Sequence, residues 1–160
     1  WWYACADGST YLKGGWFTIN GSDYLFGPNG YMSTGFLQRP SGEWVYADSE
    51  GALVGGWVRD GVYGGPHWYY LDPATKVMRT GWLFERCSWY YLGASGNMHT
   101  GWITYGSSWY YLDSTGAMRT GWFNQGGTWY YLGSDGVMLT GVQKINGRAY
   151  TFDPSGALVG

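Results

Sequence analysis

The stretch TGWLFERCSWYYLGASGNMHTGWITYGSSWYYLDSTGAMRTGW, residues 80–122, contains one 20-residue unit twice in succession. Each unit runs from Thr-Gly-Trp through Trp-Tyr-Tyr-Leu to a glycine, a methionine and the next Thr-Gly. From Gly81 to Gly141 the period is 20 residues without exception. Self-similarity at a fixed period of this length indicates a repeat architecture.

Weaker copies flank this stretch in the same register. Each copy keeps the glycines and one or more aromatic residues of the unit, and the unit after Trp57 carries an insertion, Tyr63–Pro66. The first copy, around Trp2-Tyr3, is the most blurred. We therefore expect one array over residues 1–160, with regular repeats at 57–141 and degenerate repeats at 1–56 and 142–160.

The residues of one unit, 121–140, predict a β-hairpin. Residues 122–124 and 128–132 are rich in aromatic and β-branched residues, which suit a strand. Gln125-Gly126-Gly127 supplies a turn, and a second turn follows at 133–136. A lone hairpin is marginally stable in water, so each must pack on its neighbours. The expected fold class is all-β, a solenoid of short β-hairpin repeats of about 20 residues.

Alternation along the strands predicts which rings share a face. With the turn centred between Trp122 and Trp129, these two side chains lie opposite each other and Tyr131 joins them, while Tyr130 points to the other face. In a stack, the tryptophan face of one hairpin meets the middle tyrosine of the next. The expected sets are Trp57, Trp68 and Tyr90; Trp82, Trp89 and Tyr110; Trp102, Trp109 and Tyr130; and Trp122, Trp129 and Tyr150. Phe36, Trp44 and Tyr69 form a weaker set, and Met98, Met118 and Met138 are candidates for the pocket floors.

Three rings around a small cavity form an aromatic cage, which holds quaternary ammonium ions by cation–π attraction. The same rings can instead serve only as the packing between hairpins, and both roles can coexist. Recurrence of the middle tyrosine even in weak copies, as Tyr24 and Tyr150, marks it as the stricter requirement.

Composition argues against several other functions. A net charge of −2 without a basic cluster disfavours nucleic-acid binding, and there is no apolar run long enough to span a membrane. His67 and His99 lie in or beside turns, and the carboxylates form no pair suited to acid–base catalysis. We therefore predict a binding module with no catalytic residue, metal or cofactor, and expect Cys5 and Cys87 to be unpaired. The start at Trp1-Trp2 suggests a piece of a longer chain, whose other part can be an enzyme such as a cell-wall hydrolase.

The pattern TGW, WYYL, G-x-M-x-TGW resembles the choline-binding, or cell-wall-binding, repeat family. Thr80-Gly81-Trp82, Trp89–Leu92, Gly96 and Met98 show the motif complete. The resemblance implies a left-handed superhelix of hairpins with choline sites between successive repeats, each built from two Trp, a Tyr and a nearby Met. It also implies a secreted module on the bacterial cell surface that binds phosphocholine of teichoic and lipoteichoic acids, and, in some members, a homodimer formed through terminal repeats.

Several positions depart from the family pattern. Val142 replaces the Trp of the last junction, and Asp23 replaces a strand Trp beside Trp16. Lys76 and Cys87 occupy turn positions. Similar repeats bind α-glucans or other carbohydrates, and a purely structural spacer of a surface adhesin is a third possibility. The doubled Trp of each unit favours choline.

Overall fold

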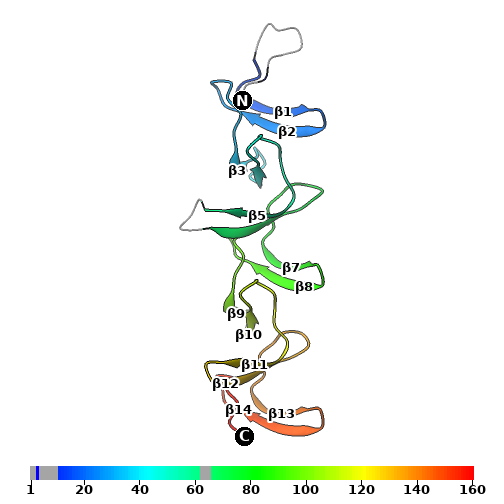
Figure 1. The fold of residues 1–160 in the computed structure, drawn as a ribbon, viewed down its shortest axis with the longest axis vertical. Helices are drawn as coiled ribbons and strands as arrows, with labels where there is room; N and C mark the ends of the chain where they lie inside the picture. Colours follow the sequence, from blue (N-terminus) through cyan, green and yellow to red (C-terminus); the bar gives the residue numbers. More distant parts are fainter. Residues whose placement is uncertain (1–2, 4–10, 62–65) are drawn as a thin grey trace. The chain divides into compact units, whose positions relative to one another are not determined.

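The fold is a series of separate two-stranded hairpins (Figure 1). The computed structural model describes residues 3, 11–61 and 66–160, and within these ranges every strand pairs only with its neighbour in sequence, giving seven antiparallel sheets. The strands are β1 (Gly15–Ile19), β2 (Ser22–Phe26), β3 (Gly35–Gln38), β4 (Trp44–Ala47), β5 (Gly56–Asp60), β6 (His67–Leu71), β7 (Gly81–Glu85), β8 (Ser88–Leu92), β9 (Gly101–Tyr105), β10 (Ser108–Leu112), β11 (Gly121–Gln125), β12 (Thr128–Leu132), β13 (Gly141–Ile145) and β14 (Arg148–Phe152). The all-β class and the hairpin repeat are confirmed.

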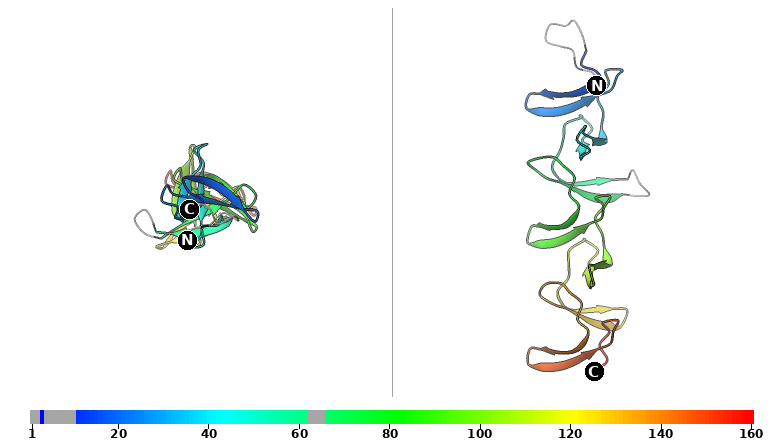
Figure 2. Two further views of the ribbon diagram at one scale, coloured as in Figure 1. Left: turned by 90° about the horizontal axis from the view of Figure 1, so that it is seen from above. Right: turned by 180° about the vertical axis from the view of Figure 1, so that it is seen from behind.

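The chain divides into two compact units. The first comprises residues 1–80 and 94–97, and the second comprises 81–93 and 98–160. In both units the hairpin ribbons remain distinct from one another (Figure 2), since no described strand of one hairpin pairs with a strand of another. The handedness of the superhelix stays a prediction.

Tight turns close most hairpins. In β11–β12, Gln125 pairs with Thr128, so only Gly126 and Gly127 form the loop, with φ of 59° and 90°. Two successive positive φ values match the right-handed twist of the strands. Arg86 and Cys87 adopt the same conformation in β7–β8 at φ of 49° and 63°, although neither is glycine.

This register corrects one detail of the expected hairpin. Trp122 pairs with Tyr131, and Trp129 pairs with Asn124, so the two tryptophans are not directly opposite. The turn is centred one residue later than expected, because Gln125 continues the strand. The prediction of which rings share a face is nevertheless correct, since Trp122, Trp129 and Tyr131 lie on one face of the hairpin.

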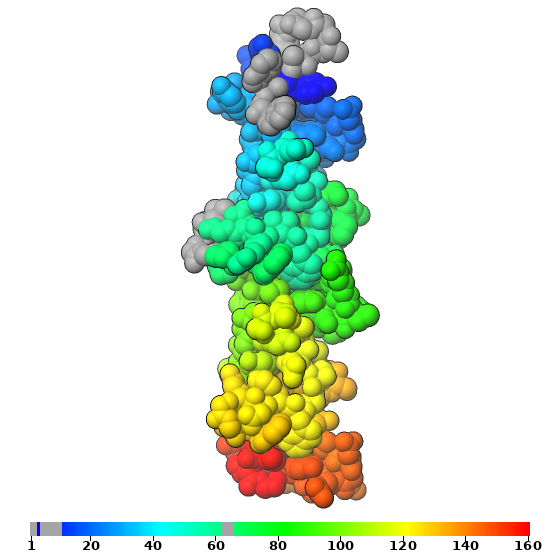
Figure 3. Space-filling model, viewed as in Figure 1, coloured from blue at the N-terminus to red at the C-terminus, as the bar shows by residue number. Residues whose placement is uncertain are grey.

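The interior of the second unit is a column of aliphatic and aromatic side chains at the end of each WYYL segment. Leu92, Leu112, Leu132 and Phe152 are almost wholly buried. Each forms an isolated bridge to the residue six positions on, such as Leu132 to Met138. The Met138 amide then donates a 2.8 Å hydrogen bond to the Trp109 carbonyl of the preceding hairpin. These links join successive repeats through the backbone as well as through side chains, and in the space-filling view β11–β12 and β13–β14 lie in direct contact (Figure 3).

Methionine side chains pack over glycines of the following turn. The Met98 thioether covers Gly116, and the same pairing recurs for Met118 with Gly136 and Met138 with Gly156. A Cβ atom at these glycines would overlap the methionine sulfur. The glycine–methionine spacing seen in the sequence is therefore a packing requirement of the stack.

Candidate aromatic cages

Three rings meet at the junction between hairpin β9–β10 and hairpin β11–β12. The Trp102 ring centroid lies 6.4 Å from that of Trp109 and 5.0 Å from that of Tyr130, with interplanar angles of 80° and 64°. Trp102 and Trp109 come from the two strands of one hairpin, whereas Tyr130 comes from the next. The rings are thus set at steep angles to one another rather than in a flat stack.

The same arrangement recurs on either side with little variation. Trp82 lies 6.4 Å from Trp89 and 4.9 Å from Tyr110. Trp122 lies 6.3 Å from Trp129 and 4.8 Å from Tyr150. The structure thus brings together three of the expected sets, all in the second unit, and we refer to these as cages.

The two tryptophans of a cage differ in exposure. Trp89, Trp109 and Trp129 are 43%, 47% and 47% exposed, whereas the first tryptophan of each cage is half-buried. Trp102 also contacts its cross-strand partner Tyr111 at 5.1 Å and Phe123 at 6.0 Å. The first tryptophan is therefore a packing residue as well as a wall, while the second mainly offers an open ring face to solvent.

In each cage, the backbone carbonyl of the exposed tryptophan accepts a hydrogen bond from the amide at the methionine position of the next unit. The Met118 amide donates to the Trp89 carbonyl, and the Met138 amide donates to that of Trp109, both at 2.8 Å. At the Trp122 cage the corresponding donor is Leu158, also at 2.8 Å from the Trp129 carbonyl. These bonds place the backbones of Met118, Met138 and Leu158 beside the exposed tryptophans of the cages.

The set expected to be weaker lies beside a cavity in the first unit. Phe36 and Tyr69 are 4.6 Å apart, and Trp44 is 40% exposed. Together with Met78 they line a cavity of about 250 Å³. The Met78 amide donates to the Trp44 carbonyl at 2.7 Å, which repeats the bond pattern of the cages.

Sequence reasoning missed several residues of this cavity. Met78 has the same place in its unit as Met118, so the repeat register was a sufficient signal for it. His67, Ser95 and Asn97 also line the cavity. Ser95 and Asn97 come from a turn two units further on, and no pattern in the sequence connects that turn to Trp44.

Two predictions remain untested by this geometry. Trp57 and Trp68 belong to the first unit and Tyr90 to the second, so that set stays a prediction. The side chains of Met98, Met118 and Met138 pack over Gly116, Gly136 and Gly156, and their role as pocket floors also stays a prediction. Cys87 is exposed and free, and Cys5 and most of the insertion at 63–66 lie outside the described residues.

The polar surroundings make the sites unequal. The Trp102 indole N–H donates a 2.6 Å hydrogen bond to the Gln125 side chain. At the equivalent place beside Trp82 stands Tyr105, whose ring lies 6.0 Å away. In the first unit, burial and then a hydrogen bond to Asp60 raise the pKa of Tyr46, whose ring lies 5.0 Å from Phe36.

The acidic residues of the turns serve the backbone. Asp113 Oδ1 accepts bonds from the Thr115 amide at 2.8 Å and the Thr115 hydroxyl at 2.6 Å. Among the residues that the structure describes, no group of three His, Cys, Asp or Glu side chains is placed to hold a metal ion. Nor does this part of the chain contain a helix long and apolar enough to cross a membrane.

Repeated hairpins with ring cages at their junctions define a class, the repeat modules that recognise small ligands between stacked units. Family models agree. The model for "Choline-binding repeat" matches residues 99–139 and 119–159, and the model for "Putative cell wall binding repeat" matches 14–32 and 80–98. The chain belongs to the choline-binding repeat family and is a cell-wall-binding repeat module with aromatic clusters between its hairpins.

Solved structures show the same fold. Choline binding protein F of Streptococcus pneumoniae is 38% identical, with a TM-score of 0.78 over 95% of this chain and 53% of that one. CbpJ from S. pneumoniae TIGR4 is 36% identical, with a TM-score of 0.82 over 99% of this chain and 56% of that one. The chain thus spans about half the length of these two proteins.

A curated relative is much longer. A "Putative endo-beta-N-acetylglucosaminidase" of S. pneumoniae serotype 4 is 31% identical over 94 residues, which are 56% of this chain but 13% of the relative. Repeats of this kind therefore occur in much larger proteins.

Proposed function

We propose that the module attaches its parent protein to the bacterial cell wall by binding choline, carried as phosphocholine on teichoic and lipoteichoic acids. The observation that carries the proposal is the recurring cage, formed by a half-buried Trp, an exposed Trp and a Tyr of the next hairpin. Secretion and display at the cell surface follow from this proposal.

Ring chemistry favours a quaternary ammonium over other ligands. A trimethylammonium group donates no strong hydrogen bond, so ring faces suit it better than carboxylates do. Each ring contributes about 0.5–2 kcal/mol, which gives roughly millimolar binding per cage after the cost of association. Several cages that engage one polymer raise the overall affinity by about 10²–10⁴.

The exposed tryptophan explains how a tethered ligand can enter. Choline on a polymer carries a bulky chain, so its cage must be open on one side. Trp109 is 47% exposed, whereas Trp102 and Tyr130 are half-buried, so we infer that the ligand enters beside Trp109. In the first unit the cavity beside Trp44 offers a further site of the same kind.

A matrix that carries tertiary or quaternary amines tests the proposal. We expect the chain to be retained and then eluted by free choline, and we expect Trp109→Ala to elute at lower choline. Val142→Ala is the matched control, since Val142 is 74% exposed and takes the tryptophan place in a hairpin without a described cage. Lack of retention, or retention on dextran that choline does not disturb, would contradict the proposal. Dimerisation through terminal repeats stays a separate prediction, for analytical ultracentrifugation.

A further inference from the structure

The junction beside Trp16 is built differently from the cages. Asp23 pairs with Thr18 across the hairpin β1–β2, the place that Trp129 occupies opposite Asn124. Val45 takes the place of the middle tyrosine in the next hairpin and is wholly buried.

Aliphatic side chains stand here where aromatic rings stand in the cages. Trp16 packs against the buried cluster of Val45, Ala47 and Leu53. Leu53 stands at the methionine position of this unit. Among the residues that the structure describes, Asp23 and Val45 stand where two rings of a cage would be, so Trp16 has no cage of the kind seen in the second unit.

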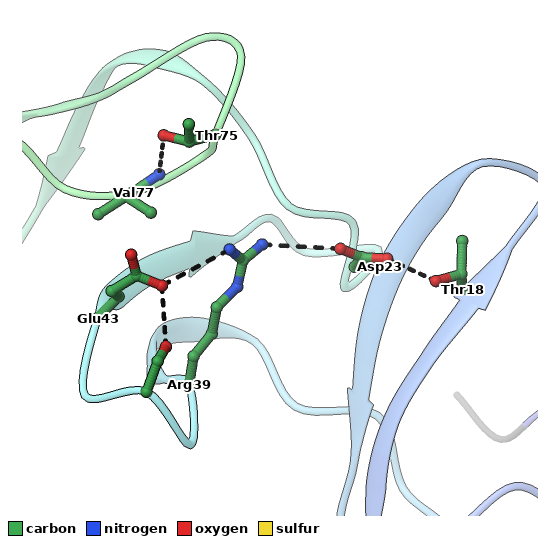
Figure 4. Close-up of polar contacts among 7 residues, drawn as sticks. Thr18, Asp23, Arg39, Glu43, Thr75 and Val77 are labelled. Atoms are coloured by element: carbon green, nitrogen blue, oxygen red, sulfur yellow. Dashed lines mark hydrogen bonds and ion pairs between the residues drawn. The ribbon is translucent and has the colours of Figure 1, made fainter.

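A network of charged and hydroxyl groups stands where the exposed tryptophan would be (Figure 4). Asp23 Oδ1 accepts a 2.7 Å hydrogen bond from the Thr18 hydroxyl, and Asp23 Oδ2 lies 3.6 Å from Arg39 Nη2. Arg39 Nη1 lies 4.0 Å from Glu43 Oε2, which also accepts a 2.9 Å bond from the Ser41 hydroxyl. The Arg39 guanidinium is thus held between two carboxylates.

The loop that supplies Arg39 is longer than the two-residue turns of the regular repeats. It covers residues 39–43, between the end of β3 and the start of β4. Backbone bonds close it, from the Arg39 amide to the Glu43 carbonyl and from the Gly42 amide to the Arg39 carbonyl, each at 2.9 Å. The extra residues bring a positive charge to the hairpin β1–β2.

An open hollow of about 500 Å³ lies over this network. Its lining includes Trp16 and Phe17 together with Thr18, Asp23, Arg39 and Ser41. Aromatic faces beside a few fixed polar groups are typical of a small-molecule site. Because Trp16 also packs on the buried cluster, its ring is held in place before any ligand arrives.

The charges decide which ligand fits. The Arg39 guanidinium in the hollow is paired with Asp23, and Glu43 stands on its other side, so no unneutralised positive charge is left for a phosphate or another anion. Both ion pairs are longer than a direct hydrogen bond, so one ligand hydroxyl can accept from the guanidinium and donate to a carboxylate at once. A sugar ring offers adjacent hydroxyls of this kind and an apolar face for an indole.

We propose that this hollow binds an uncharged saccharide, and that the module therefore carries a glycan site distinct from its cages. The glycan strand of a cell wall supplies this chemistry. A saccharide bound near Trp16 adds one more contact with the wall, independent of choline.

Titration of the chain with maltotriose and with tri-N-acetylchitotriose tests the proposal, in saturating choline so that the cages are full. The readout is the indole N–H signal of Trp16 in a ¹H–¹⁵N NMR spectrum, assigned by its loss in Trp16→Phe. We expect at least one trisaccharide to shift this signal with a dissociation constant of about 1 mM. Arg39→Gln and Asp23→Asn should each weaken this binding by about tenfold, since each removes charge-assisted hydrogen bonds.

Arg86→Gln is the control, because its side chain is 84% exposed in the turn of another hairpin. It should leave saccharide binding unchanged, and none of these charge variants should alter choline elution from an amine matrix. The proposal is overturned if neither sugar shifts the Trp16 signal at about 20 mM. It is also overturned if both charge variants bind as the wild type does, or if inorganic phosphate displaces the sugar. Since choline elution is measured separately, failure here is distinguishable from failure of the choline proposal.

Discussion

The buried glycine of each regular turn lacks a side chain for two independent reasons. Gly116 has a φ of 84°, and the Met98 sulfur occupies the space where a Cβ would lie. Gly121 has a similar φ of 77°, but nothing lies within 4 Å of its Cβ position. A comparison of Gly116 with Gly121 therefore separates the cost of a left-handed backbone from the cost of steric overlap.

Substitution of these glycines by alanine should give unequal losses in stability. Gly121→Ala should cost about 1–2 kcal/mol, from the left-handed backbone alone. Gly116→Ala should cost about 1–3 kcal/mol more, because Met98 must move. Urea unfolding followed by tryptophan fluorescence measures both, and equal losses would show that the methionine–glycine contact is unimportant.

Asp113 makes the turn sensitive to acid. Its partial burial opposes ionisation, but hydrogen bonds from Thr115 and Ala117 outweigh burial and lower the pKa of the carboxyl. Hydrogen bonds from neighbouring turn residues likewise lower the pKa of Asp72 and of Asp153. A lowered pKa in the folded state stabilises it fully above the unfolded value of about 3.9, and this contribution disappears as pH falls through the folded value.

Stability should therefore be flat from neutral pH down to about pH 5 and fall below about pH 4. Asp113→Asn keeps an acceptor oxygen but cannot titrate, so it should be less stable at pH 7 and show a shallower loss in acid. Denaturant midpoints across this range test the effect. Parallel profiles for the two proteins would rule out Asp113 as a source of the acid sensitivity.

For the hairpin, the sequence predicted correctly which rings share a face, but not which residues pair across the two strands. Strand alternation alone places Trp122, Trp129 and Tyr131 on one side, and a shift of the turn by one residue in the loop does not change that. The position of the turn was not predictable, because Gln125, Gly126 and Gly127 offer several ways to close the loop. Partners such as Ser95 and Asn97 reach their cavity only through stacking, which no local pattern reports.

The two tryptophans of a cage should respond differently to truncation. Trp109→Ala removes an exposed wall, so it should abolish choline binding at its cage with a loss of stability below about 2 kcal/mol. Trp102→Ala removes a ring that contacts Tyr111, Phe123 and Tyr130, so it should cost about 3–5 kcal/mol as well as the site. Choline titration beside urea unfolding of each variant tests this, and equal stability losses would contradict the division of roles.

For the whole molecule, the 20-residue period was sufficient to predict a repeat array and its all-β class. The replacement of the Trp16 cage by an ion-paired network was only partly predictable. Asp23 signalled a lost tryptophan, but the position of Arg39 depends on the loop at 39–43. Division into two compact units had no signal in the sequence, since the repeat runs through the boundary without a change in composition.

When cages are removed, retention on a choline polymer should fall by a larger proportion than the number of cages does. Loss of one cage by Trp109→Ala should weaken polymer binding by about tenfold or more, and a second loss by Trp129→Ala should multiply that effect. Binding of free choline should fall only in proportion to the cages removed. Elution profiles and calorimetry compare the two, and equal proportional losses would show that the cages do not act together on a polymer.

The most direct test of the cages follows the indole N–H signals of Trp82, Trp102 and Trp122 while choline is added to the intact chain. The structure predicts that all three signals shift with dissociation constants of about 1 mM, since the three cages have nearly the same ring geometry. Trp109→Ala should abolish the shift of Trp102 and leave that of Trp82 unchanged. If saturating choline leaves the three indole signals where they were, the rings serve only to pack the hairpins together, and the central claim is wrong.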